Sequence, residues 1–144
     1  MKQILFIALI LSLLLAGACQ PLCGCSPVQP LSFTGKYILV NPKTDYTFTL
    51  TIETKPSQTN SDVYQITGLS SVNQYGADAT IQPDGTVNVS SIISTKRGGT
   101  PEAMNAETNY YNSLQKATKA EIVGGNLHLR SSDTNWSLLV YNKQ

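Results

Sequence analysis

Apolar and polar residues alternate through most of the chain after about residue 32, which is the pattern of β-strands with one buried face. The clearest case is Tyr46, Phe48, Leu50 and Ile52, which alternate with threonines. In such a strand the aromatic and aliphatic side chains face the core and the threonines face solvent. Strand character returns in six further segments: 33–40, 63–69, 75–81, 86–92, 119–130 and 136–141.

Turn-forming residues separate these segments. Pro83-Asp84-Gly85 predicts a tight turn, because proline fixes φ and glycine accepts a positive φ. Gly124-Gly125-Asn126 predicts a hairpin inside segment 119–130. Gly68 lies within a strand-like segment, where a glycine marks a bulge or the close approach of another backbone. We expect antiparallel pairing across both turns.

One segment departs from the alternation and predicts a helix at about 101–117. Thr100 suits the N-cap, Pro101 suits the first helical position, and Glu102 favours the positive helix start. The apolar face of this helix is predicted to be an approximate stripe of Met104, Tyr111, Leu114 and Thr118, with four flanking residues: Ala103, Ala106, Tyr110 and Ala117.

The order of strands, one helix and further strands predicts an α+β fold with mostly antiparallel pairing. One helix cannot cover both faces of a flat sheet. We therefore expect a strongly curled or partly open β-barrel of about seven to eight strands, with the helix closing one side or end. A chain of this size suits one domain, which we place at 32–144.

The first residues predict export. Lys2 precedes an apolar run at 4–15, and small residues then lead to Cys19. This is the pattern of a secretory signal peptide, which we place at 1–18, since a spanning helix needs about 20 apolar residues. Residues 19–31 contain three prolines and predict an extended, flexible tether.

Two kinds of signal cleavage fit the junction. Ala16-Gly17-Ala18 fits ordinary signal cleavage, whereas Leu15 through Cys19 resembles a bacterial lipobox, although Ala16 stands where leucine is common. We expect lipidation at Cys19, including palmitate, so that the membrane is a partner through this anchor. The alternative is a secreted protein with an unmodified Cys19. Cys23 and Cys25 are interpreted as incidental thiols, because no downstream ligands complete a metal site.

Charge excludes one class of partner. The chain has ten basic and nine acidic residues, and loss of Lys2 with the signal peptide leaves nine of each. A neutral surface provides no electrostatic basis for binding nucleic acid.

No catalytic spacing is visible. His128 is the only histidine, and it is predicted to face away from the core side of its strand, opposite to Leu127 and Leu129. No motif places a nucleophile beside it, so we interpret it as a surface histidine. The carboxylates are scattered, and we expect neither a metal nor a cofactor. Gly98-Gly99-Thr100 is interpreted as a linker with a helix cap rather than an anion site.

Five segments in this order resemble the META domain, which is typical of small bacterial heat-shock-type lipoproteins: Phe33-Thr34-Gly35-Lys36-Tyr37, Gly68 through Gly76, Ser94-Thr95-Lys96-Arg97, Glu107 through Leu114, and Gly125-Asn126-Leu127-His128-Leu129. The resemblance implies a partly open barrel with one helix, an envelope location and an association with stress tolerance. It implies no enzymatic activity.

The chain departs from this family at two positions. The family often has cysteines where this chain has Val72 and Gly99-Thr100. If those cysteines pair in relatives, their joint loss is coherent, and Val72 then fills the core. Asn73 remains, and we interpret it as a turn residue that bonds its own backbone.

These observations favour a non-catalytic envelope lipoprotein, expected in the outer membrane and facing the periplasm, whose partner is an unknown envelope protein. One alternative is a lipoprotein that binds a small apolar ligand or lipid, or acts as a pilot for another protein. Another is a secreted hydrolase inhibitor that uses the loop from Lys55 to Ser61. The ligand-binding residues stay unknown from the sequence.

Overall fold

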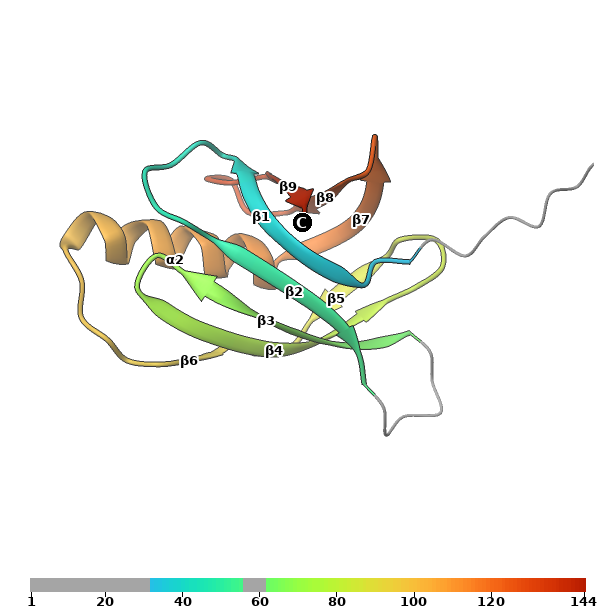
Figure 1. Ribbon diagram of the computed structural model, residues 1–144, viewed down its shortest axis with the longest axis horizontal. Coiled ribbons are helices and arrows are strands. Elements are labelled where there is room, and N and C mark those ends of the chain that lie inside the picture. The colour runs from blue at the N-terminus through green and yellow to red at the C-terminus, as the bar shows by residue number, and fades with distance from the viewer. Residues whose placement is uncertain (1–31, 56–61) are drawn as a thin grey trace, which may run out of the picture.

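The computed structural model describes residues 32–55 and 62–144 (Figure 1). The predicted signal peptide, the tether with Cys19, and residues 56–61 of the proposed inhibitory loop lie outside the described residues. Within the two described ranges, no helix is both long and apolar enough to cross a membrane.

Nine strands and the helix α2 follow one another along the described chain (Figure 1). Most of their bounds match the predicted segments within a few residues. The elements are β1 (Gly35–Asn41), β2 (Thr49–Thr54), β3 (Val63–Ser70), β4 (Asn73–Ile81), β5 (Val87–Val89), β6 (Ile93–Ser94), α2 (Pro101–Gln115), β7 (Ala117–Val123), β8 (Asn126–Ser131) and β9 (Leu138–Lys143).

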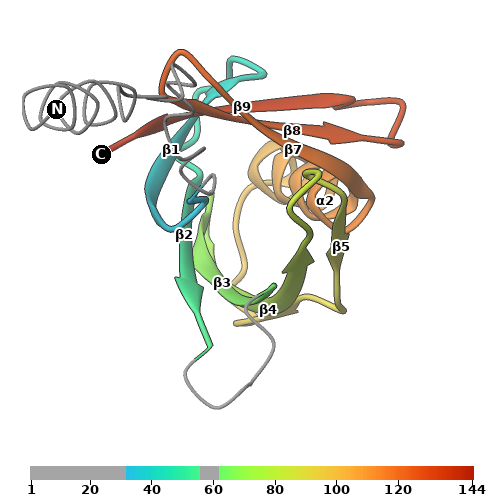
Figure 2. The same cartoon turned by 90° about the vertical axis from the view of Figure 1, so that its right-hand side faces the viewer.

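The strands form one antiparallel sheet in the order β5-β4-β3-β2-β1-β9-β8-β7, and β6 pairs with β4 beside this path. Figure 2 shows how the sheet curls around its own axis, with α2 on the side where β7 approaches β5. This confirms the predicted α+β fold with a curled, partly open barrel. The additional strand arises because β5 stops at Val89, and pairing with β4 resumes only at Ile93.

The barrel has one seam, between β5 and β7. A single bridge joins Thr86 to Lys119, and the Ala120 N–H donates to the Gly85 carbonyl at 2.7 Å. Gly85 has a φ of 86°, and a side chain there would overlap the Ala120 carbonyl oxygen. The predicted turn at 83–85 therefore does more than reverse the chain, since it brings one edge of the sheet against the other.

The predicted alternation places the expected residues in the core. Phe48, Leu50 and Ile52 are at most 2 % exposed, and Tyr46 is half-buried against them. Aliphatic side chains around Leu50 and Leu129 leave a void of only about 10 Å³, which is at the lower limit for one water molecule. The interior is therefore filled, as in other small barrels.

Gly68 allows two strands to approach closely. The β3–β4 register runs through it without a shift, so no bulge is present. A side chain at Gly68 would overlap the Thr49 carbonyl oxygen, and Tyr75 donates a hydrogen bond to that oxygen at 2.9 Å. The structure therefore confirms the prediction that another backbone approaches closely at Gly68.

Helix α2 begins as predicted. The Thr100 hydroxyl accepts a hydrogen bond from the Ala103 N–H at 3.3 Å, and Pro101 is the first helical residue. The helix ends at Gln115 rather than at residue 117, because Ala117 already pairs in β7.

The predicted apolar stripe of α2 is wrong in part. Met104 and Tyr111 are only half-buried, and Thr118 is exposed on β7. The helix buries five residues: Ala103, Glu107, Tyr110, Ser113 and Leu114. Two of them, Glu107 and Ser113, are polar. A carboxylate can occupy a buried face when hydrogen-bond donors surround it, and the residues around Glu107 provide them.

Candidate functional site

The buried polar side chains gather at one end of the barrel. We call Ser70, Asn73, Glu107 and Tyr111 the Glu107 cluster. Ser70 ends β3 and Asn73 begins β4, so both flank the same two-residue turn, and Glu107 and Tyr111 lie one turn apart on α2. Ser70, Asn73 and Glu107 are at most 5 % exposed. The cluster therefore joins the β3–β4 turn to the helix.

Three hydrogen bonds hold the Glu107 carboxylate. Its Oε2 accepts from the Ser70 hydroxyl at 2.8 Å and from the Asn73 N–H at 3.2 Å, and its Oε1 accepts from Asn73 Nδ2 at 2.8 Å. No Lys or Arg side chain in the described ranges forms an ion pair with it. Neutral donors alone therefore compensate for the burial of this carboxylate.

Asn73 connects the cluster to the segment after β6. Its Oδ1 accepts from the Thr95 hydroxyl at 2.8 Å and from the Arg97 N–H at 2.7 Å, and its Nδ2 donates to the Arg97 carbonyl at 3.2 Å. The interpretation of Asn73 as a residue that bonds its own backbone is thus wrong. It bridges three segments, because its burial places both ends of the amide against α2 and the segment after β6.

The cluster contains a serine beside a carboxylate, but the serine is enclosed. Ser70 is 0 % exposed, and its hydroxyl oxygen lies 3.0 Å from the Asn73 carbonyl oxygen and 2.8 Å from Glu107 Oε2. The Tyr111 hydroxyl lies 2.5 Å from the same oxygen. A substrate would have to displace part of this network to reach Ser70. The arrangement is suited to holding three segments together.

Three buried tyrosines form a second network beside the cluster. Tyr75 donates to the Thr49 carbonyl, so the hydrogen between Tyr75 and Tyr110 at 2.7 Å belongs to Tyr110, and Tyr141 donates to Tyr110 at 3.1 Å. Burial raises the pKa of all three hydroxyls well above the usual value. This chain of donors therefore stays protonated when exposed tyrosines ionise.

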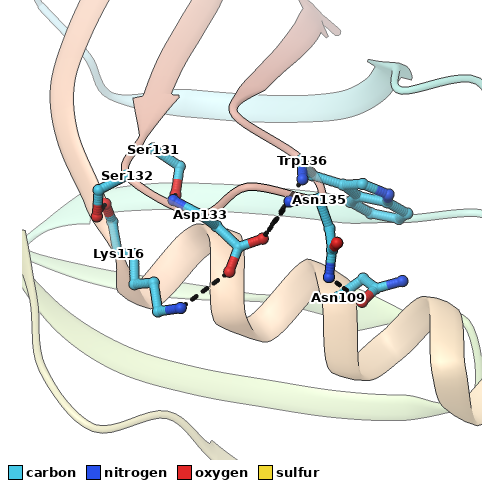
Figure 3. Close-up of polar contacts among 7 residues, drawn as sticks. All are labelled: Asn109, Lys116, Ser131, Ser132, Asp133, Asn135 and Trp136. Atoms are coloured by element: carbon cyan, nitrogen blue, oxygen red, sulfur yellow. Dashed lines mark hydrogen bonds and ion pairs between the residues drawn. The ribbon is translucent and has the colours of Figure 1, made fainter.

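A third polar group lies in the loop between β8 and β9 (Figure 3). The Asp133 carboxylate accepts from Lys116 Nζ at 3.0 Å and from the Asn135 N–H at 2.9 Å. The hydrogen bond from Lys116 lowers the pKa of Asp133 below its usual value. Trp136 packs edge-on against Phe48, with ring centroids 5.8 Å apart. These contacts fix the C-terminal end of α2 against the barrel.

His128, the histidine that the sequence singled out, is not part of these groups. His128 is half-buried on β8 opposite Glu121, on the face away from Leu127 and Leu129, as predicted. Its side chain forms no hydrogen bond or ion pair with any described residue. Over the described ranges, no group of three His, Cys, Asp or Glu side chains gathers closely enough to hold a metal ion. Cys19 is outside the described residues.

Val72 and Gly99 are in contact. A Cβ atom at Gly99 would lie 2.7 Å from Val72 Cγ2, and Val72 is half-buried. These are the positions where the resembling family often has cysteines. In a disulfide, the Cβ of one residue lies about 3 Å from the sulfur of the other. The structure thus brings together the two positions that differ from the family pattern.

The comparisons with known proteins agree with this geometry. The family model described as META domain matches residues 38–143. The chain belongs to the META domain family. This family is one of envelope-associated, stress-related proteins. Three of the five resembling segments, 68–76, 94–97 and 107–114, meet in the Glu107 cluster.

A solved structure supports the fold independently. The NMR structure of a protein from Burkholderia xenovorans superposes with a TM-score of 0.56 at 17 % identity, covering 76 % of this chain and 81 % of the other. At this identity the likeness concerns the fold alone. No curated protein matches the sequence significantly.

Sequence reasoning missed Glu107 as a buried residue, although one pattern pointed to it. Ala103, Glu107, Tyr110 and Leu114 follow a spacing of four, three and four residues, which marks one face of a helix. The glutamate breaks the apolar pattern, so the predicted stripe is centred on Met104 and Tyr111 instead of their buried neighbours Ala103 and Tyr110. Nothing in the sequence marks Asp133, whose partner Lys116 lies at the end of the helix.

Proposed function

We propose that this META domain protein is a non-catalytic lipoprotein of the cell envelope that acts by binding another envelope component. Residues 1–18 direct export, lipid chains on Cys19 anchor the mature chain, and residues 19–31 connect the anchor to the barrel. The domain faces the periplasm from the outer membrane.

One observation carries the proposal. The side chains that resemble catalytic groups, Ser70, Glu107 and Tyr111, are hydrogen-bonded to one another, and the first two are almost fully buried. Their chemistry is used to hold the helix and two loops together. The family match adds support, because it concerns envelope-associated proteins. The filled interior argues against the alternative in which a lipid occupies the barrel.

The anchor is tested by the intact mass of the mature protein extracted from membranes, with Cys19→Ala as the control. We expect a chain that begins at a lipid-modified Cys19, and we expect the variant to leave the membrane fraction. An unmodified mature chain would remove the anchor from the proposal and favour the secreted inhibitor.

The absence of catalysis is tested separately. The purified protein is assayed with ester, amide and glycoside substrates, beside His128→Ala and Ser70→Ala variants. We expect no turnover that depends on either residue. Hydrolysis that disappears with either substitution, while the variant remains folded by circular dichroism, would overturn the non-catalytic function.

A further inference from the structure

The segment between β5 and α2 offers a surface that the fold itself does not use. We call residues 90–100 the strap. Every residue from Thr95 to Glu102 is exposed, and Ile93 is the most exposed large apolar residue described, at 78 %. In Figure 1 the strap passes along the lower edge and reaches the left end of the molecule, away from the end where β1 begins.

The strap presents an unpaired strand edge. The Thr95 N–H donates to the Gln74 carbonyl, and Ile93 pairs with Gly76, so both residues direct their backbone groups toward β4. Alternation then directs the N–H and C=O of Ser94 to the opposite edge. Among the described residues, no backbone partner binds Ser94 at that edge. Such an edge can accept another extended segment.

A shallow hollow lies on the β4 side of Ile93. It has a volume of about 340 Å³, and its lining includes Gly76 and Ala77 together with the polar residues Gln65, Asp78, Ser90 and Ser91. An apolar side chain from an added strand therefore finds its apolar contact on Ile93 itself, which is exposed.

Two cations follow the edge directly. Lys96 and Arg97 are exposed, and neither forms an ion pair with a described residue, whereas Lys55, Lys116 and Arg130 do. Asn73 holds the Arg97 backbone through two hydrogen bonds, so the backbone that carries this side chain is fixed beside β6. Unpaired charges beside a binding edge select a partner of opposite charge.

We propose that the edge of β6 binds an extended segment of a partner protein that carries carboxylates opposite Lys96 and Arg97 and an apolar residue beside Ile93. The segment adds to the sheet as a strand. A phosphate-rich polymer would use the two cations but neither the Ser94 backbone nor the exposed Ile93 side chain, so a protein segment fits more of the surface. This inference deepens the proposed binding function and rests on it.

The test uses the mature full-length protein in detergent and a labelled seven-residue peptide with two glutamates followed by alternating valines and threonines. Fluorescence anisotropy gives the dissociation constant, and amide resonances report the site. We expect saturable binding and a shift of the Ser94 amide with slower hydrogen exchange. Two control peptides carry lysines for the glutamates or N-methyl groups on alternate residues, and we expect about tenfold weaker binding of each.

The matched protein variants are Lys96→Glu/Arg97→Glu and Lys36→Glu/Lys43→Glu, which change the net charge equally. We expect the first to weaken binding about tenfold and the second to leave it unchanged. Equal effects of both pairs would show that net charge alone acts. An N-methylated peptide that binds as tightly as its parent, or inorganic polyphosphate that competes fully, would overturn strand addition.

The other candidate to bind the edge of β6 is a second copy of this chain. Sedimentation of wild type and Ile93→Ser distinguishes it, since dimers that dissociate on this substitution would replace the proposed partner. The assay does not depend on Cys19. An unlipidated Cys19 would therefore show in the intact mass and would contradict only the anchor. Absence of peptide binding would contradict only the proposed binding at the strap.

Discussion

At the scale of single residues, the buried tyrosine hydroxyls donate hydrogen bonds to one another in one direction. This direction determines how much stability is lost when each hydroxyl is removed. The chain of donors runs from Tyr141 through Tyr110 and Tyr75 to the Thr49 carbonyl. Removal of the first donor leaves no donor without an acceptor. Removal of the last one leaves both Tyr110 and the Thr49 carbonyl without this partner, and an unsatisfied buried group is costly.

We therefore expect Tyr75→Phe to lower the free energy of unfolding by about 2–3 kcal/mol and Tyr141→Phe by about 1 kcal/mol. Urea unfolding followed by circular dichroism measures both values. Equal losses would contradict the direction assigned to the chain.

Two buried serines are expected to respond to alanine substitution with opposite changes in stability. Ser113 is fully buried, and its hydroxyl has no hydrogen-bond partner in the structure described, whereas the Ser70 hydroxyl is bonded to Glu107 and Tyr111. We expect Ser113→Ala to stabilise the protein by about 1 kcal/mol, because an unsatisfied hydroxyl is removed and alanine favours the helix. Ser70→Ala should destabilise it by about 1–3 kcal/mol. Thermal unfolding of the two variants compares the signs, and a loss of stability in Ser113→Ala would mean that its hydroxyl has a partner.

At the scale of elements, the Glu107 cluster holds α2, the β3–β4 turn and the strap as one unit. We expect Glu107→Ala to leave the Asn73 N–H without an acceptor and to cost about 2–3 kcal/mol. Hydrogen exchange at Arg97, whose N–H is bonded to Asn73, should accelerate more than exchange in β8. Glu102→Ala is the matched control, since Glu102 is exposed on the same helix and its loss costs about 0.3–1 kcal/mol. Equal protection of Arg97 in both variants would contradict the role of the cluster.

The contact between Val72 in the β3–β4 turn and Gly99 in the strap can be tested directly by cross-linking. We expect Val72→Cys/Gly99→Cys to form a disulfide under oxidising conditions, closing a loop that contributes about 3.5 kcal/mol of stability in the chain-entropy estimate. Non-reducing mass spectrometry and thermal unfolding measure the bond and its effect. The single variants serve as controls, and free thiols in the oxidised double variant would show that the backbones are held too far apart.

The sequence predicted most elements because their signals are local. The alternation at Phe48, Leu50 and Ile52, the Thr100 cap and the Gly124-Gly125 turn each depend on neighbouring residues, and each is confirmed. The contacts of Glu107 and Asn73 depend on segments about 34 residues apart, which no local pattern encodes. The break between β5 and β6 was missed as well, since both strands are defined by their pairing with β4.

At the scale of the whole molecule, the buried tyrosines set an alkaline limit to stability. Burial raises the pKa of Tyr75, Tyr110 and Tyr141 well above 10.0 in the folded state, whereas the unfolded chain ionises near that value. Above about pH 10 the unfolded state therefore holds fewer protons, and the free energy of unfolding falls as pH rises. With three such groups, the free energy of unfolding falls by up to about 4 kcal/mol per pH unit.

We expect the urea midpoint to fall steeply above about pH 10 and tyrosinate absorbance to appear in two steps. The first step comes from tyrosines outside this hydrogen-bonded chain, and Tyr75, Tyr110 and Tyr141 ionise together with unfolding. Reversible ionisation of all seven tyrosines in the folded state would contradict this account.

The two ends of the domain meet in the middle of its sheet. Ile38 in β1 pairs with Asn142 in β9, so the central strand pair joins residues more than a hundred positions apart. Such distant pairing forms slowly and requires β9. During the proposed export, a chain that is still crossing the membrane lacks this partner strand for β1 until β9 has also crossed. The topology therefore delays completion of the sheet until both of these strands are on the same side of the membrane.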